Sequence, residues 1–246
     1  MRHFQLLAFA SCAFAFSTRA PPRQRLARAL RSAVDDDEND LVAELATTLE
    51  PGVVLLAPPS EYDTFLRHQL LLVVERDSEG GGVGLILDRP TALSIGEAAP
   101  GAVGPGALAA NTLYMGGEHG GQKVVLLHEY ESIDGARPVG ASGLCVGGVA
   151  HAVACVEGDV LPPSEFKFFF NEYIWLPGAI EQMVDRDDDG SFSPRGFLPL
   201  RLDTRLVLRQ QGKAGKLWSE VRRLLRSRGV SLSRDDAQGE EDAQST

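Results

Sequence analysis

The chain has 246 residues, 43% of them apolar, which is enough for one domain with a substantial hydrophobic core. Its net charge of −10 is uneven, because residues 1–34 carry six arginines and no acidic residue, whereas the rest holds 18 basic and 34 acidic residues. An acidic body lacks the clustered lysine and arginine that neutralise phosphates, so nucleic acid is not an expected partner of that body. Three cysteines without a CxxC pair predict neither a disulfide framework nor a zinc motif.

Residues 1–40 have the pattern of a targeting leader, which we expect to be cleaved or disordered. A basic start precedes an apolar stretch at residues 4–16, and residues 17–33 are rich in arginine and hydroxyl side chains without acids. The letters AFAFSTRAPP resemble the bipartite leader, a signal peptide followed by a transit peptide, of algae with complex plastids. We therefore predict the plastid (chloroplast stroma) as the location, with secretion as the alternative.

The first part of the domain, from Pro51, alternates short apolar runs with turn-forming residues. Strands are predicted at residues 53–57, 70–75 and 83–88. Short helical turns are predicted at residues 41–49, after Ser60, and at 91–98 with Thr91 as the cap. The glycine, proline and alanine composition of residues 100–110 predicts a flexible loop.

The second part is again rich in short apolar runs. Further strands are predicted at residues 113–115, 124–128, 144–146, 150–156, 166–175 and 197–208. Helices are predicted after Pro177 and, with a clear amphipathic pattern, from Leu217 to a stop at Gly229. Residues 231–246 form a polar, acidic tail that we expect to be disordered. No apolar run approaches the roughly 20 residues of a membrane helix, so no membrane span is expected in the mature chain.

These elements predict the fold class. Strands outnumber long helices and do not alternate with them, which argues against a doubly wound parallel sheet. We predict an α+β fold, a single domain at residues 51–230 built around a mixed or largely antiparallel β-sheet with flanking helices.

The order of several short motifs resembles the YqgE/AlgH family. The matching pieces are LLAPPSEYDTF, LLLVVE, GVGLILDRP, MGG at residues 115–117, LLH at 126–128, Gly158-Asp159, Trp175, Gly178, Glu181 and Leu217-Trp218. The resemblance covers roughly residues 51–230 and implies a single α+β domain around a mixed sheet. Bacterial members have been labelled transcriptional regulators, but their biochemical activity is not established.

Some positions depart from the family pattern. Asp88 stands where the family has asparagine, Glu118 replaces proline after the paired glycines, and Ala179 replaces glutamine. The aromatic strand also differs, with residues 171–175 reading NEYIW. If these positions form a binding surface, we expect the ligand of this chain to differ from that of a bacterial relative.

Two glycine-marked corners predict a site. The strand GGVGLILDRP ends in Asp88-Arg89-Pro90, and a second corner follows at residues 116–119. We expect the two to converge, and the candidate binding surface comprises Asp88, Arg89, Pro90, Gly116, Gly117, His119, His128 and Trp175. The leading hypothesis is a non-catalytic binding or regulatory module with a protein or small-molecule partner. The alternative is an enzyme with its site between the 88–90 and 116–119 loops.

A second alternative is weak calcium binding. Asp185, Asp187 and Asp189, followed by Gly190, reproduce the first half of an EF-hand loop after a predicted helix. The bidentate glutamate of position 12 is replaced by Gly196, and no helix is predicted to follow. A solvated acidic loop is the simpler interpretation; apart from calcium, no cofactor is predicted.

Other combinations of reactive residues are weaker. A metal or acid–base cluster of Glu118, His119, His128, Glu129 and His151 lacks a recognised spacing, and Cys145 or Cys155 as a nucleophile would sit in an apolar strand. A basic helix face of Arg222, Arg223, Arg226 and Arg228 is either solvated or a docking surface. No GxSxG or phosphate-binding loop is present. This lack of a catalytic constellation favours the binding module.

Overall fold

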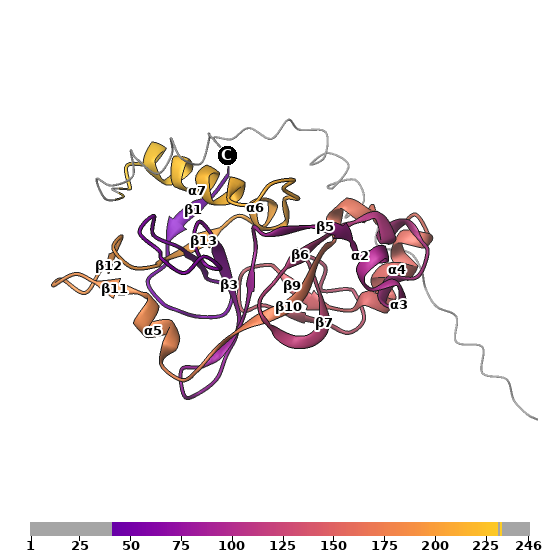
Figure 1. Cartoon of the computed structure of the whole chain (residues 1–246), viewed down its shortest axis with the longest axis horizontal. Helices are drawn as coiled ribbons and strands as arrows, with labels where there is room; N and C mark the ends of the chain where they lie inside the picture. Colours follow the sequence, from indigo (N-terminus) through magenta and orange to yellow (C-terminus); the bar gives the residue numbers. More distant parts are fainter. Residues whose placement is uncertain (1–40, 231, 233–246) are drawn as a thin grey trace, which may run out of the picture. The chain divides into compact units, whose positions relative to one another are not determined.

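A computed structural model of the chain describes residues 41–230 and residue 232 (Figure 1). The predicted leader at residues 1–40 and, apart from residue 232, the predicted tail at 231–246 lie outside the described residues. Among the described helices, none has both the length and the apolar character needed to cross a membrane.

A large sheet organises the domain (Figure 1), with strand order β1-β13-β2-β3-β4-β10-β7-β9-β8 and with β5 and β6 joined to it through β10. Neighbouring strands are antiparallel except for β6 and β10, which are parallel. The strands are β1 Ala43–Leu45, β2 Val54–Leu56, β3 Leu70–Arg76, β4 Gly82–Ile86, β5 Pro90–Ser94, β6 Thr112–Met115, β7 His119–His128, β8 Ala136–Pro138, β9 Cys145–Gly147, β10 Lys167–Trp175 and β13 Leu198–Leu202. A separate hairpin pairs β11 Asp185–Arg186 with β12 Phe192–Ser193.

Short helices flank the sheet, so the predicted α+β class with a largely antiparallel sheet is confirmed. In Figure 1, α7 lies over β1 near one end of the domain, whereas α2, α3 and α4 gather at the other. The helices are α2 Ile95–Ala98, α3 Pro100–Val103, α4 Val149–Glu157, α5 Ala179–Met183, α6 Thr204–Leu208 and α7 Lys216–Ser227, with 3-10 turns η2 Ala107–Ala110 and η3 Pro163–Glu165.

The aromatic strand β10 divides the core, because successive side chains of a strand point to opposite faces. Phe169 belongs to the cluster that contains Tyr114 and Trp218 of α7, whereas Phe168, on the other face, belongs to the cluster that contains Leu126 and Ile95. Farther along β10, Trp175 belongs to a third cluster that includes Ile180 of α5 and Leu71 of β3. The strand predicted at residues 166–175 therefore lies at the centre of the sheet, between β4 and β7.

Two predicted elements have the opposite secondary structure. Residues 43–45 form strand β1, not a helical turn, and join the sheet ahead of residue 51 because β1 pairs with β13 and buries Ala43. Residues 149–157 form helix α4, not a strand, with Ala152 and Val156 buried four residues apart on one face. In such short apolar runs, tertiary burial decides between helix and strand.

Four other segments differ from prediction in detail. The helix predicted at 91–98 starts later, because residues up to Ser94 belong to strand β5. Ser94, not Thr91, caps α2: its hydroxyl accepts from Glu97 N at 3.3 Å, and the Glu97 carboxylate accepts from Ser94 N at 2.8 Å. The loop predicted at 100–110 contains α3 and η2, whose Val103 and Leu108 are buried. The strand predicted at 197–208 is shorter, because β13 ends at Leu202 and helix α6 begins at Thr204. The residues after Ser60 form a turn rather than a helix.

Candidate functional site

The two glycine-marked corners are in direct contact. The amide of Met115 donates to the carbonyl of Arg89 at 2.8 Å, and the amide of Ile86 donates to the carbonyl of Gly116 at 2.8 Å. Pro90 lies opposite Tyr114 where β5 pairs with β6. The contact is made by the main chain, so the space between the corners is filled by hydrogen-bonded backbone.

Gly116 and Gly117 allow this corner to pass close to β10. A Cβ on Gly117 would lie 2.0 Å from the carbonyl carbon of Glu172, and a Cβ on Gly116 would lie 2.5 Å from the carbonyl oxygen of Asn171. At this crossing β10 is irregular: its register shifts between Phe170 and Glu172, and Asn171 has a φ of 62°. The glycine pair is thus explained by packing against a β-bulge.

Asp88 points into the protein and is fully buried. Its Oδ2 accepts a hydrogen bond from the amide of Trp218, in the first turn of α7, at 3.1 Å. Its Oδ1 has no hydrogen-bond partner among the described residues. Burial raises the pKa of Asp88 to about 7, against the lowering effects of the α7 amides and the Lys167 charge.

Lys167 is the second buried ionisable group near this corner, and the sequence analysis did not single it out. Its Nζ donates to the carbonyls of Val207 and Arg209, both at 3.0 Å, and lies 4.5 Å from the centre of the Tyr114 ring. Burial lowers its pKa to about 7, although the Asp88 charge acts in the opposite direction. Its place within the aromatic run FKFFF was the available signal, since consecutive residues at the start of that strand are buried on both faces.

Tyr114 completes this internal polar group. Its hydroxyl donates to the carbonyl of Gln211 at 3.0 Å and accepts from the amide of Gln211 at 2.6 Å. Burial raises the pKa of Tyr114 to about 12. Asp88, Tyr114 and Lys167 therefore bind main-chain groups of the C-terminal part of the chain and are closed off from solvent.

Arg89 and Trp175, both predicted site residues, also have structural partners. The Arg89 guanidinium donates to the carbonyl of Phe65 at 2.9 Å and lies 4.1 Å from the centre of the Phe65 ring. Trp175 is buried over Gly84, and its Nε1 contacts Met183 Sδ at 3.0 Å. Arg89 thus ties the loop at residues 57–69 to the corner, and Trp175 is a core residue.

The two histidines of β7 lie at opposite ends of that strand. His119 is exposed beside the corner, opposite Glu172, whereas His128 is buried nine residues later, roughly 30 Å away at the usual rise of a strand. The His128 ring accepts from the amide of Tyr130 at 3.0 Å and faces the carbonyl of Gly147 at 3.2 Å. Burial lowers the pKa of His128. The structure therefore does not bring His128 to the candidate surface.

Acidic and aromatic side chains gather beside the corner, in a group that we call the Tyr173 surface: Glu61, Tyr62, Asp63, Glu118 and Tyr173. Burial raises the pKa of Tyr173, and the negative charges of Asp63, Glu118 and Glu61 raise it further. Tyr62, which lies between Glu61 and Asp63 in the chain, is 92% exposed. Sequence reasoning missed this surface because its residues come from three segments that are far apart in the chain.

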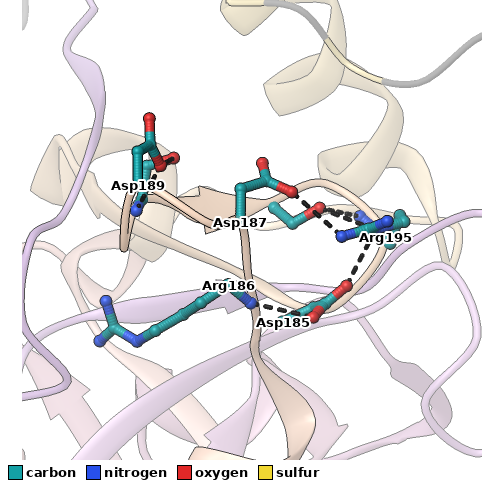
Figure 2. A network of polar contacts seen from close by, with 7 residues as sticks. Asp185, Arg186, Asp187, Asp189 and Arg195 are labelled. Atoms are coloured by element: carbon teal, nitrogen blue, oxygen red, sulfur yellow. Dashed lines mark hydrogen bonds and ion pairs between the residues drawn. The ribbon is translucent and has the colours of Figure 1, made fainter.

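The predicted calcium loop is a hairpin held by an arginine (Figure 2). Arg195 donates to Asp185 Oδ2 and to Asp187 Oδ1, each at 3.0 Å. Asp189 turns away from both and accepts from the hydroxyl of Ser191 at 2.6 Å (Figure 2). Across residues 41–230, no group of three or more histidine, cysteine, aspartate and glutamate residues could hold a metal ion, which also covers the predicted histidine cluster. Calcium binding stays a prediction.

The remaining candidates lie elsewhere. Cys145 is buried on β9 and Cys155 is half-buried on α4, and burial raises the pKa of both thiols, which disfavours the thiolate. Arg222 is 3% exposed and lies 4.7 Å from the centre of the Trp218 ring. The prediction that Arg222 lies on the solvated face of α7 was therefore wrong.

The fold and the corner define a class: a single α+β domain on a largely antiparallel sheet, with a glycine-rich turn packed on an aromatic central strand. A profile of the AlgH-like family matches residues 54–228, and the chain belongs to that family. Among relatives, a UPF0301 protein of Chlorobium phaeobacteroides is 31% identical over 54% of this chain and 70% of its own length. A UPF0301 protein of Mycobacterium leprae is 26% identical over 81% of this chain and 98% of its own length.

Solved structures agree on the fold. The AlgH protein of Pseudomonas aeruginosa superposes with a TM-score of 0.52 and 18% identity, covering 74% of this chain and 90% of that chain. A protein of Corynebacterium diphtheriae gives a TM-score of 0.55 and 20% identity, covering 73% and 88% of the two chains. Neither the family match nor the solved structures establish an activity for this chain.

Proposed function

We propose that this protein is a non-catalytic binding module, acting in regulation, whose Tyr173 surface binds a lysine- or arginine-rich segment of a partner protein. One observation carries the proposal. The ionisable groups behind the corner, Asp88, Tyr114 and Lys167, are buried and bound to main chain, whereas the Tyr173 surface beside the corner gathers acidic and aromatic side chains.

The chemistry of this surface suits a cationic partner. Carboxylates attract guanidinium and ammonium groups, and an exposed tyrosine ring binds them through cation–π contacts. Long-range attraction acts in the same direction, since the chain after residue 34 carries 18 basic and 34 acidic residues. Tyrosine is also enriched at protein interfaces, where its ring is buried at low entropic cost.

Fluorescence anisotropy with labelled oligo-arginine and oligo-glutamate peptides tests the proposal on the full chain. We expect binding of the arginine peptide that weakens with salt, and a several-fold loss of affinity in a Tyr62→Ala/Glu118→Gln variant. Glu131→Gln is the matched control, because Glu131 is exposed beyond the other end of β7. Equal affinity for both peptides, or an equal loss in the control, would contradict the proposal.

An enzyme with its site between the 88–90 and 116–119 loops is the second candidate. The shifted pKa values of Asp88 and Lys167 favour it, because such shifts cluster at functional sites, although hydrogen-bonded main chain fills the space between the two corners. Because both groups are buried, this enzyme would have to open its C-terminal part to admit a substrate. Turnover of any compound in a metabolite screen, abolished by Asp88→Asn, would establish it.

We propose the plastid as the place of action, on the strength of the leader pattern at residues 1–40. A fluorescent protein fused behind these residues should enter the plastid of an alga with complex plastids. Replacing Phe14 and Phe16 with alanine should divert the fusion from the plastid. Secretion of the unaltered fusion would favour the alternative location.

A further inference from the structure

Three buried side chains of the sheet hold the C-terminal segment, residues 203–228, by its main chain. Asp88 follows β4, Tyr114 belongs to β6 and Lys167 belongs to β10. Their hydrogen bonds reach successive main-chain groups, at Val207, Arg209, Gln211 and Trp218. In Figure 1 this segment, α6 and α7, lies along one side of the domain.

The two charged members of this group share an unusual position. Asp88 is fully buried and Lys167 is 1% exposed, yet each bonds to main chain and not to the other. One oxygen of Asp88 has no partner among the residues that the structure describes. A buried charge without a directly bonded counter-charge is costly, so the cost of keeping the segment closed depends on the protons that the two groups carry.

We propose that Asp88 and Lys167 make the attachment of the C-terminal segment proton-dependent, so that the segment opens most readily near neutral pH and is held more firmly on either side of it.

The direction of the pH effect on opening follows from the direction in which burial shifts the pKa of each group. Burial raises the pKa of Asp88 from 3.8 to about 7, so opening in acid releases a proton and a lower pH favours the closed state. Burial lowers the pKa of Lys167 from 10.5 to about 7, so opening in alkali takes up a proton and a higher pH favours the closed state. Each group can change the equilibrium constant for opening by at most about tenfold per pH unit.

Other charged groups near the pair act in known directions. Glu220 of α7 faces Asp88 and is bonded to Arg209, and its charge helps to raise the pKa of Asp88. The Trp218 ring contacts His68 and Arg222. Burial and two arginines lower the pKa of His68, so opening lets it gain a proton in acid, which opposes the effect of Asp88. A His68→Gln background removes this opposing effect.

Amide hydrogen exchange on the full chain, from about pH 5.5 to about pH 8.5, tests the proposal. The readout is the protection factor of the Gln211 and Trp218 amides. This ratio of intrinsic to observed exchange rate is already corrected for the pH dependence of the exchange chemistry. We expect a minimum near neutral pH, with protection rising on both sides in the His68→Gln chain. Asp88→Asn should remove the acid side only, and Lys167→Met the alkaline side only.

Core amides of β3 separate local opening from global unfolding, because they exchange only when the sheet opens. If a variant fails to fold, the profile of the His68→Gln chain decides alone. A flat profile, or the same profile at the β3 amides, would overturn the proposal.

Discussion

Replacing Gly117 with alanine should strongly destabilise the protein. The new Cβ would lie 2.0 Å from the carbonyl carbon, 2.1 Å from the carbonyl oxygen of Glu172 and 2.2 Å from the amide nitrogen of Tyr173. These are main-chain atoms of β10, which is held by β4 on one side and β7 on the other, so they cannot rotate away as a side chain would. Overpacking typically costs about 1–3 kcal/mol where side chains can adjust, and we expect about 3 kcal/mol or more here.

Urea unfolding followed by circular dichroism measures this effect. A loss of about 3 kcal/mol should lower the melting temperature by roughly 6–12 °C in a domain of this size. Gly101→Ala is the matched control: Gly101 lies in α3 with nothing within 4 Å of the added Cβ, so this change should be neutral or stabilise by up to about 1 kcal/mol. Normal stability of Gly117→Ala would refute the packing explanation and return the glycine pair to a ligand-binding role.

Three further predictions concern other parts of the domain. Arg195→Gln should increase heat and stabilisation on calorimetric titration with Ca²⁺ relative to the unaltered chain, because the Arg195 guanidinium occupies Asp185 and Asp187; an unchanged titration would contradict this. Asp203→Ala should cost about 1 kcal/mol in urea unfolding, since Asp203 caps α6; no loss would show that the cap is dispensable. Burial lowers the pKa of His128, so the neutral side chain stabilises the fold and this contribution is lost as pH falls below 6.5. His128→Gln should therefore flatten the dependence of the free energy of unfolding on pH below 6.5.

The strands were predictable because their apolar runs are separated by polar or turn-forming residues, such as the glycine-rich loop at residues 77–82. The runs at residues 70–75 and 83–88 correspond to β3 and β4, and the aromatic run at 166–175 corresponds to β10. Prediction was wrong where an apolar run is short or rich in alanine, as in α4, because such a run fits a helix face and a buried strand equally well. At residues 100–110 proline starts a helix and does not break one, since Pro100 occupies the first turn of α3.

The site was less predictable than the fold. The approach of the two corners could be anticipated from their glycines, but the sequence does not tell whether glycines face a ligand or another strand. Only the position of Gly117 against Glu172 distinguishes these cases. The Tyr173 surface depends on the loop at residues 60–65 coming near enough to β10 for the charges of Glu61 and Asp63 to act on Tyr173, a proximity of distant segments that no local pattern encodes.

Lys167 and Asp88 illustrate a limit of residue-type reasoning. A charged residue at the end of an apolar strand is normally expected at the surface, where aspartate and lysine are most often found. Here both side chains turn inward, because each satisfies main-chain groups that the C-terminal segment would otherwise bury without partners: two carbonyls for Lys167 and the Trp218 amide for Asp88. The pattern that could have revealed them is an apolar strand that stays buried on both faces, so that a polar residue within it has no exposed side to occupy.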